Sequence, residues 1–300
     1  VFGDWSSDAC SSDLAHVIFN PASGSYSVDR QQQVLGALNR GGISAKPYLP
    51  SGEQETVALV QELCADQKQL LIVAVGGDGT INTVINGMQP QRATLGVIPL
   101  GTANVLAWEL GIKSIEDAVQ RLATGTPRPF SVGEVTTANG RRRFLLMAGI
   151  GIDGAVVAGV RNTEKRRWGK VAYLLSAIRE IWRWDTSLLT VNDGERSCSC
   201  QSVIVANAAH YGGPYRLVQQ TNLLSEGLEL VPLELPQRRS LLAYLPKLLL
   251  PDQVVSSSGW LVRDGVITIS GGKPIQLDGD PFGSGPLEIR LIPNFNNLLC

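Results

Sequence analysis

Three glycines bracket a single carboxylate in residues 76–80, Gly-Gly-Asp-Gly-Thr, directly after a short apolar run. Apolar residues then recur between 81 and 88 with the spacing of one helix face. This order of buried strand, glycine turn and helix start gathers backbone N–H groups where the helix dipole favours anions. Glycine lets the backbone approach a ligand closely, and Asp78 would repel a phosphate unless a metal or water mediates. The segment predicts a site for nucleotide phosphates with Mg²⁺.

Two further polar loops follow short apolar runs. Residues 20–24, Asn-Pro-Ala-Ser-Gly, come after the run at 15–19, and residues 100–104, Leu-Gly-Thr-Ala-Asn, come after the run at 95–99. The carboxyl ends of parallel strands meet at one edge of a sheet, where such sheets bind ligands. We therefore expect the two glycine-rich strand ends, near 76–79 and near 101, to lie at the same edge.

The first part of the chain alternates between strand and helix patterns. Strands are predicted at 15–19, 43–49, 70–75 and 95–99. Helices are predicted before Gly41, over 53–66, from Thr80, from Ala103, and over 115–122 behind the N-cap Ser114. This alternation over roughly 110 residues predicts a doubly wound parallel sheet.

The pattern changes near Pro127, after which strand patterns follow one another. Turn signals at 192–194 and 264–265 predict hairpins, and helices are predicted at 170–184 and 240–250. This half is predicted to be mainly antiparallel β. The strands are expected at 130–136, 143–148, 187–191, 197–206, 228–233, 260–262, 266–270 and 287–292.

Composition narrows the class of protein. The net charge of −1 argues against a nucleic-acid-binding surface, and five scattered cysteines indicate a reducing, cytoplasmic setting. No stretch of 18 apolar residues and no signal peptide is present. Residues 1–13 lack any periodicity, and we expect them to be a disordered or non-native leader.

Together, the three loops give the chain a resemblance to the diacylglycerol kinase catalytic-domain family, above all to its soluble bacterial lipid kinases. The resemblance implies an ATP-binding α/β domain over 14–128 and a β-sandwich-like lipid-substrate domain over 129–286. It also implies that the last strand, about 287–300, returns to the first domain and that the active site lies between the two. The ATP contacts that it implies are Asn20, Ser23, Gly76, Gly77, Asp78, Gly79, Thr80, Ile81, Asn82 and Thr102.

The segment Asp278-Gly279-Asp280 matches the family's catalytic turn, in which a glutamate usually accepts the substrate proton. Here the matching residue is Asp280, one methylene shorter. A carboxylate of either length can take a hydroxyl proton within hydrogen-bond reach. Asp278 is expected to orient Asp280 or to share its metal, and Asp78 to hold catalytic Mg²⁺. Taken alone, the same three residues predict only a β-turn.

A further segment, 223–228, resembles the family's structural Mg²⁺ loop. The backbone carbonyls of Leu223 and Leu228 and the side chain of Glu226, in place of the family's aspartate, would bind the metal. Thr83 stands where the family commonly has a glutamate. The three arginines at 141–143 are expected at a polar hairpin tip. The basic stretch 165–170 and the helix after it would rest either on an anionic bilayer or in the core.

The resulting hypothesis is an ATP-dependent kinase that phosphorylates a hydroxyl of a membrane lipid such as diacylglycerol. We expect it in the cytoplasm, associated peripherally with the membrane while it acts. It would have no nucleic-acid partner, and a homodimer is allowed. Two alternatives stay open: an NAD kinase-like phosphotransferase, and a non-catalytic nucleotide-binding regulator. The loop at 100–104 and the turn at 278–280 fit the lipid branch better.

Overall fold

The computed structural model describes residues 14–66, 69–160, 175–177, 179–180, 183, 185–234 and 259–300. The predicted leader at 1–13, the basic stretch 165–170 and the predicted helix 240–250 lie outside these ranges, as does most of the predicted helix 170–184. The chain divides into two compact units. Unit 1 consists of Val1–Leu100, Ile112–Pro129 and Asn294–Cys300, and unit 2 of Gly101–Gly111 and Phe130–Pro293.

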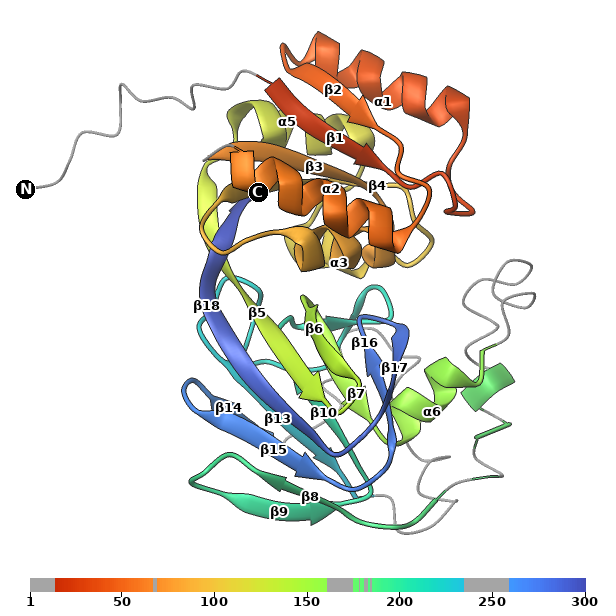
Figure 1. The fold of residues 1–300 in the computed structure, drawn as a ribbon, viewed down its shortest axis with the longest axis vertical. Coiled ribbons are helices and arrows are strands. Elements are labelled where there is room, and N and C mark those ends of the chain that lie inside the picture. The colour runs from red at the N-terminus through yellow and green to blue at the C-terminus, as the bar shows by residue number, and fades with distance from the viewer. Residues whose placement is uncertain are drawn as a thin grey trace, which may run out of the picture. The chain divides into compact units, whose positions relative to one another are not determined.

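Unit 1 contains a parallel sheet in the order β2-β1-β3-β4-β18. Helices α1 and α5 lie on one side of it, and α2 and α3 lie on the other (Figure 1). Because both faces are covered, β1 and β3 are almost entirely apolar, as is typical of parallel strands. The predicted doubly wound sheet is therefore confirmed. The elements are β1 (Leu14–Phe19), α1 (Val28–Arg40), β2 (Ser44–Tyr48), α2 (Glu53–Asp66), β3 (Leu70–Gly76), α3 (Asp78–Gly87), β4 (Ala93–Pro99), α5 (Ile115–Thr124) and the end of β18 (Leu287–Leu299).

The strand order reverses between β1 and β3. From β1 the chain leads to β2 on one side, and it then returns to place β3 and β4 on the other side. In open α/β sheets, ligands bind outside the carboxyl ends of the strands at such a reversal. The loops after β1 and β3 are therefore the expected binding corner of this unit.

Helix boundaries in this part of the chain follow local rules with two differences. Ser27 and Ser114 cap α1 and α5 by accepting N–H bonds from Arg30 and Asp117. Helix α3 begins at Asp78, two residues before the predicted start. The prediction of Ala103 as a helix residue is wrong, because Asn104 has a left-handed φ of 46° and α4 (Val105–Leu110) begins only after it.

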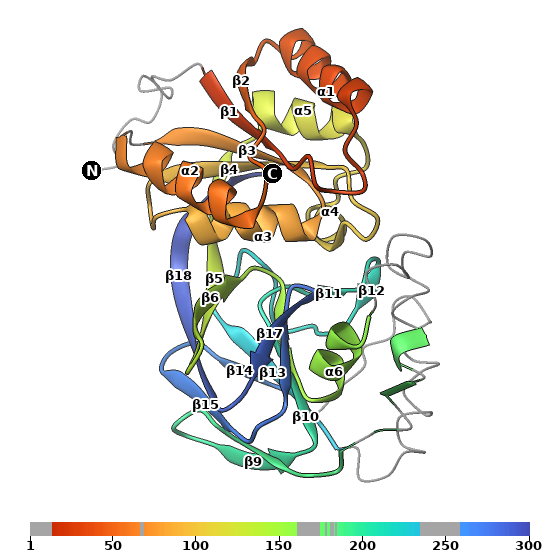
Figure 2. The same ribbon diagram turned by 45° about the vertical axis from the view of Figure 1, so that its right-hand side comes forward.

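Unit 2 has a six-stranded antiparallel sheet in the order β14-β13-β10-β7-β16-β17. Helix α6 (Ile152–Ala158) packs against β16 and β17 of this sheet (Figure 2). The inner face of the sheet contributes Ala148, Ile150, Val203 and Val205 to a continuous apolar core. The strands are β7 (Met147–Ile150), β10 (Ser202–Ala206), β13 (Leu228–Leu233), β14 (Trp260–Val262), β16 (Pro274–Leu277) and β17 (Asp280–Ser284).

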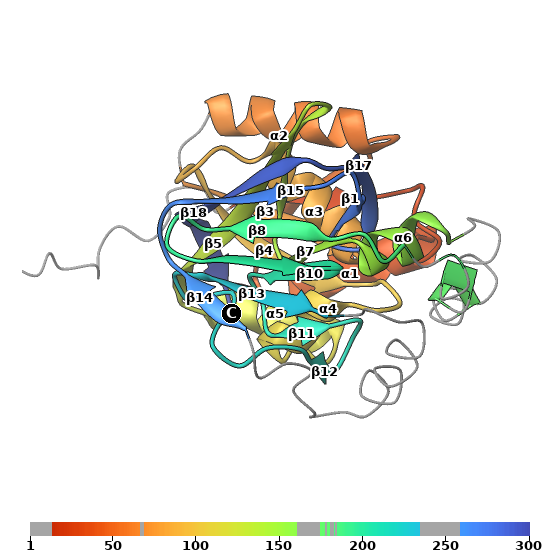
Figure 3. The ribbon, with the colours of Figure 1, turned by 90° about the horizontal axis from the view of Figure 1, so that it is seen from below.

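A second layer of unit 2 packs on the same core. Strands β8, β15 and the first part of β18 lie side by side in it, with β9 beyond β8 (Figure 3). The antiparallel β-sandwich that the resemblance implied is therefore confirmed. The remaining strands are β5 (Pro127–Thr137), which pairs with β18 and with β6 (Gly140–Phe144), and β8 (Leu189–Asn192), β9 (Ser197–Cys200), β11 (His210–Tyr211), β12 (Tyr215–Arg216) and β15 (Val266–Ser270).

Two strand predictions and one hairpin prediction need correction. The predicted strand 143–148 is broken, because the N–H groups of residues 145–147 bond the carboxylate of Asp278. The predicted strand 197–206 is divided at Gln201 between the two sheets. The turn at 264–265 joins β14 and β15, which also belong to different sheets, whereas the predicted hairpin at 192–194 joins the paired strands β8 and β9.

None of the helices in the described ranges combines the length and apolar character needed to cross a bilayer.

Asn296, near the end of β18, binds the strand to unit 1 through its buried side chain. Its Oδ1 accepts the N–H groups of Arg92 and Ala93, each at 3.0 Å, and its Nδ2 donates to the carbonyl of Gln89 at 3.0 Å. Removing the amide would leave buried polar groups without partners, which typically costs about 1–3 kcal/mol for each group.

Replacement Asn296→Leu is therefore expected to lower the free energy of unfolding by about 3 kcal/mol. The matched control is Asn297→Leu, at the neighbouring position that is exposed. Urea unfolding followed by circular dichroism measures both variants. Equal unfolding midpoints for the two would contradict this account of β18.

Candidate active site

The glycine turn at residues 76–80 forms the start of helix α3. Gly76 ends β3, and a Cβ at this position would lie 2.6 Å from Oγ1 of Thr80, so the turn has no room for a side chain there. Gly77 is the N-cap of α3 and offers no side-chain oxygen to the first turn. The start of the helix therefore keeps its positive end for a ligand, which suits a phosphate group.

The loop after β1 contacts this turn at the strand-order reversal. Nδ2 of Asn20 donates to Oγ1 of Thr80 over 3.4 Å, while Oδ1 of Asn20 accepts the N–H of Ala22 at 3.0 Å. The N–H of Ser23 donates to the carbonyl of Asn20 at 3.1 Å, which keeps Ser23 in the same loop. The structure thus brings the predicted residues Asn20, Ser23 and Thr80 to one corner.

Two of the residues predicted to contact ATP, Ile81 and Asn82, interact mainly with their own helix. The side chains of Ile81 and Asn82 are buried, the N–H of Ile81 donates to the carbonyl of Gly77, and Oδ1 of Asn82 accepts from Asn86. Their role as nucleotide contacts stays a prediction. The hydroxyl of Thr83 donates to the carbonyl of Gly79 at 2.9 Å, so this threonine supports the turn from within the helix.

Asp78 is the first residue of α3, where the helix dipole stabilises a negative charge. Within the described ranges, no group of three or more His, Cys, Asp or Glu side chains gathers in metal-binding geometry. Mg²⁺ is commonly held by one or two carboxylates together with substrate phosphates and water. Asp78 fits that mode of binding, in which the nucleotide completes the metal site.

The second loop, residues 100–104, begins beside the glycine turn at 76–80, because the N–H of Leu100 donates to the carbonyl of Gly76 at 2.9 Å. Further along it, Thr102 is exposed and Nδ2 of Asn104 donates to the carbonyl of Gly101 at 2.8 Å. Oδ1 of Asn104 is buried and has no hydrogen-bond partner among the described residues. An acceptor left in this state is suited to a donor group of a ligand.

Asp278 and Gly279 form a two-residue hairpin turn between β16 and β17, and together with Asp280 they make up the segment 278–280. Asp278 and Gly279 have φ angles of 51° and 87°, as the type I′ turn of an Asp-Gly pair requires. The Asp278 carboxylate accepts three backbone N–H bonds, from Leu145 at 2.7 Å, Leu146 at 2.8 Å and Met147 at 2.9 Å. These contacts favour the prediction that Asp278 orients Asp280 over the alternative that it shares a metal.

Asp280 follows the turn and begins β17, with 37% of its side chain exposed. Nη2 of Arg142 lies 4.0 Å from its Oδ2, and the arginine side chain is only 17% exposed. Arg141 and Arg143 instead face Glu134, at 3.6 and 3.5 Å.

The three arginines therefore lie in β6, after the hairpin tip at which they were predicted, and the sequence analysis missed that Arg142 lies beside Asp280. The available signal was the alternation of side chains along a strand, which sends the middle arginine of three to the opposite face.

The predicted metal loop at 223–228 forms hydrogen bonds with residues outside it. The hydroxyl of Thr221 donates to the carbonyl of Gly227 at 2.8 Å, and the carbonyl of Leu223 accepts the N–H of Ser131 at 3.4 Å. Glu226 is exposed on this loop, and Leu228 begins β13. One carboxylate and two carbonyls are oxygen ligands of the kind that Mg²⁺ takes, and binding by Leu223, Glu226 and Leu228 stays a prediction.

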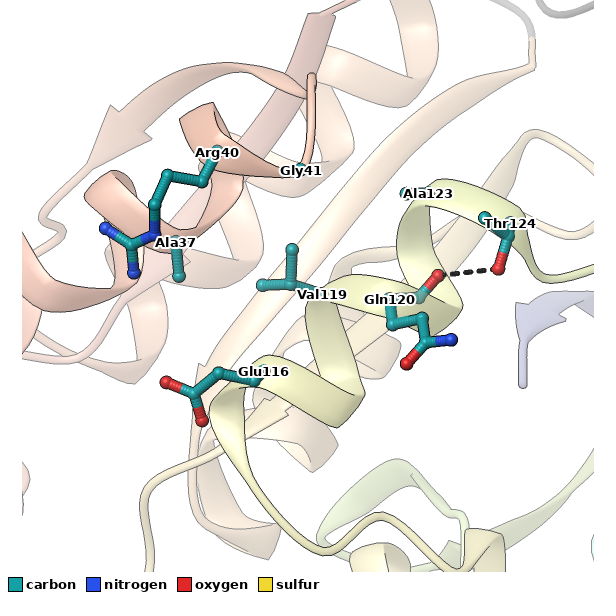
Figure 4. A pocket seen from close by; sticks show the side chains of 8 residues that line it. All are labelled: Ala37, Arg40, Gly41, Glu116, Val119, Gln120, Ala123 and Thr124. Atoms are coloured by element: carbon teal, nitrogen blue, oxygen red, sulfur yellow. Dashed lines mark hydrogen bonds between the residues drawn. The ribbon is translucent and has the colours of Figure 1, made fainter.

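A hollow of about 340 Å³ lies between α1 and α5 (Figure 4). Its walls are mostly apolar, with Arg40 on one side and Glu116 on the other. None of the predicted site residues lines it. The chemistry of this chain is therefore better sought at the strand ends and the 278–280 turn.

Known proteins share both halves of the chain. Residues 14–135 match the family described as "Diacylglycerol kinase catalytic domain", and residues 147–300 match the "YegS C-terminal NAD kinase beta sandwich-like domain". A diacylglycerol kinase of Bacillus subtilis is 34% identical over 172 residues, which cover 56% of this chain and 55% of that protein. The chain thus spans about half the length of this relative.

Other similar proteins are covered more fully. A Pseudomonas aeruginosa protein named "Probable lipid kinase YegS-like" is 30% identical over 230 residues, 74% of each chain. The crystal structure of a diacylglycerol kinase from Bacillus anthracis superposes with a TM-score of 0.74 over 95% of this chain and 96% of that one. At 22% identity, this likeness supports the fold alone. The chain belongs to the family of diacylglycerol kinases and YegS-like lipid kinases.

Proposed function

We propose that this protein is an ATP-dependent kinase that phosphorylates a hydroxyl group of a membrane lipid of the diacylglycerol type. The single observation that carries the proposal is the 278–280 hairpin of unit 2, where a backbone-anchored turn presents the half-exposed Asp280 beside Arg142. Family membership supplies the reaction class, and the glycine turn of unit 1 supplies a corner suited to nucleotide phosphates.

The ATP phosphates would bind at the start of α3, where Gly76 and Gly77 allow close approach of the backbone and Asn20 supports Thr80. Asp78 would hold Mg²⁺ together with the phosphates, and the metal would neutralise part of their negative charge. Thr102 and the unpartnered Oδ1 of Asn104 are proposed as further nucleotide contacts from the second loop.

Asp280 would act as the general base. As the lipid hydroxyl oxygen bonds to the γ-phosphorus, the bond from that phosphorus to the β–γ bridging oxygen breaks and ADP leaves. The hydroxyl proton passes to the carboxylate of Asp280. The guanidinium of Arg142 would help to hold that carboxylate in place, and it would add a positive charge beside the proposed base.

The substrate implies work at a membrane surface, to which the protein would bind peripherally from the cytoplasm. The loop containing Leu223, Glu226 and Leu228 is proposed as a structural Mg²⁺ site that stiffens unit 2. The relatives' names favour a lipid acceptor over NAD, and NAD is kept as a test acceptor.

The defining experiment measures transfer of labelled γ-phosphate from ATP, with Mg²⁺, to a panel of lipids in mixed micelles. The panel contains diacylglycerol, phosphatidylglycerol, a sphingoid base and a polyprenol, with NAD as the soluble acceptor. We expect label in a lipid. Label on NAD alone would reject the lipid kinase, and no label on any acceptor would favour a nucleotide-binding regulator.

Replacement Asp280→Asn is expected to lower kcat by about 10²–10⁴-fold, because it removes the proton acceptor without changing the shape of the side chain. ATP affinity, measured by calorimetry, should stay unchanged. Asp264→Asn is the matched control, since Asp264 is an exposed aspartate in another turn of unit 2. Wild-type turnover by Asp280→Asn would eliminate this residue as the base.

Replacement Arg142→Ala is expected to lower kcat about tenfold, which corresponds to roughly 1.4 kcal/mol of lost transition-state stabilisation. The Michaelis constant for ATP should change little. Arg141→Ala removes an equal charge one residue away, from a side chain that is 70% exposed and faces Glu134, and it should retain full activity. An equal loss in both variants would indicate a general charge effect and not the contact with Asp280.

A further inference from the structure

A buried carboxylic acid lies behind the 278–280 turn and takes no part in the mechanism above. Asp153 is the second residue of α6 and is 6% exposed. Its Oδ1 accepts a short hydrogen bond from the hydroxyl of Tyr211, and its Oδ2 accepts from Nε2 of Gln276 at 2.6 Å. Both partners are neutral groups, and neither carries a charge that would balance an ionised carboxylate.

The second partner connects Asp153 to the catalytic turn. Oε1 of Gln276 accepts the N–H of Gly279 at 2.7 Å. Gly279 is the central residue of the turn, between Asp278 and Asp280. A continuous row of hydrogen bonds therefore leads from Tyr211 through Asp153 and Gln276 to the peptide group between Asp278 and Gly279, one residue before Asp280.

The packing around Asp153 leaves the row little freedom. A Cβ at Gly149, the residue of β7 that pairs with Gln276, would lie 1.8 Å from Oδ2 of Asp153. A Cβ at Gly154 would lie 2.2 Å from the carbonyl oxygen of Pro274, because α6 approaches β16 so closely. Two glycines thus make the space in which the carboxyl group meets Gln276.

We propose that Asp153 is a positioning residue, which acts through Gln276 and the amide of Gly279 to set the direction of the Asp280 side chain. This inference rests on the proposed role of Asp280 as general base. Asp278 holds the turn from one side through residues 145–147, and Gln276 holds its next peptide group from within β16. Two separate sets of hydrogen bonds therefore fix neighbouring residues of the turn, which a single set would leave free to change its orientation.

Burial raises the pKa of the Asp153 carboxyl, although the hydrogen bonds from Tyr211 and Gln276 lower it. Asparagine keeps the shape of this side chain and can contact both partners. Its amide oxygen can accept from Gln276, and its amide nitrogen can donate to the tyrosine oxygen, because a phenol both donates and accepts.

The test compares four variants in phosphate transfer and in hydrogen–deuterium exchange of peptides covering 276–281. Asp153→Ala and Gln276→Leu cut the row and are expected to lower kcat roughly tenfold or more, with an unchanged Michaelis constant for ATP and faster exchange at 276–281. Asp153→Asn is expected to keep kcat and the exchange at 276–281 near wild type. Ser202→Ala is the matched control, because the Ser202 hydroxyl bonds the start of α6 at Ile152 but not the turn.

Two outcomes would overturn the proposal. If Asp153→Asn loses as much kcat as Asp153→Ala, the charge of the carboxylate acts directly. If Ser202→Ala loses as much kcat as Gln276→Leu, the effect belongs to general stability, which thermal unfolding of all variants also reports.

If no acceptor is ever phosphorylated, the proposed function fails. Exchange then decides alone: faster exchange in Gln276→Leu and Asp153→Ala but not in Asp153→Asn supports the row, and unchanged exchange rejects it.

Discussion

The Asp278 carboxylate is the contact on which the proposed base and its neighbours depend. Three backbone N–H groups donate to it, from Leu145, Leu146 and Met147. Hydrogen bonds to a charged group contribute about 1.5–3 kcal/mol each, so the contact is strong. It ends β6 shortly after Arg142 and holds the turn that leads to Asp280. One interaction therefore sets the position of the base and of the arginine beside it.

A second constraint governs the nucleotide corner in unit 1. The strand order of the parallel sheet reverses between β1 and β3, and open α/β sheets bind ligands outside the strand ends at such a reversal. The lack of a side chain at Gly76 and of a side-chain cap at Gly77 keeps that helix start available for phosphate. In the proposed function, the backbone would make most of the phosphate contacts, and the hydrogen bond between Asn20 and Thr80 joins the two loops.

Local patterns allowed most elements to be predicted. Strand–turn–helix order, the cap Ser114 and the Asp-Gly turn all act within a few residues, which is why the fold class and the corner at 76–80 followed from the sequence. Contacts between distant segments could not be predicted in this way. Asp278 and its donors lie 131–133 residues apart, and Asp153 and Gln276 lie 123 apart. The division of the predicted strand 143–148 had the same cause, because its N–H groups bond a carboxylate that no local pattern indicates.

The most direct test of this account is the rate of γ-phosphate transfer to lipid by folded Asp278→Asn, with ATP affinity measured on the same sample. The neutral amide carries an N–H donor where the carboxylate has an acceptor, so the bonds from residues 145–147 weaken. The account predicts a loss of kcat approaching that of Asp280→Asn, with ATP binding retained. A wild-type rate in a variant whose amides at 145–147 have lost their protection from exchange would contradict it.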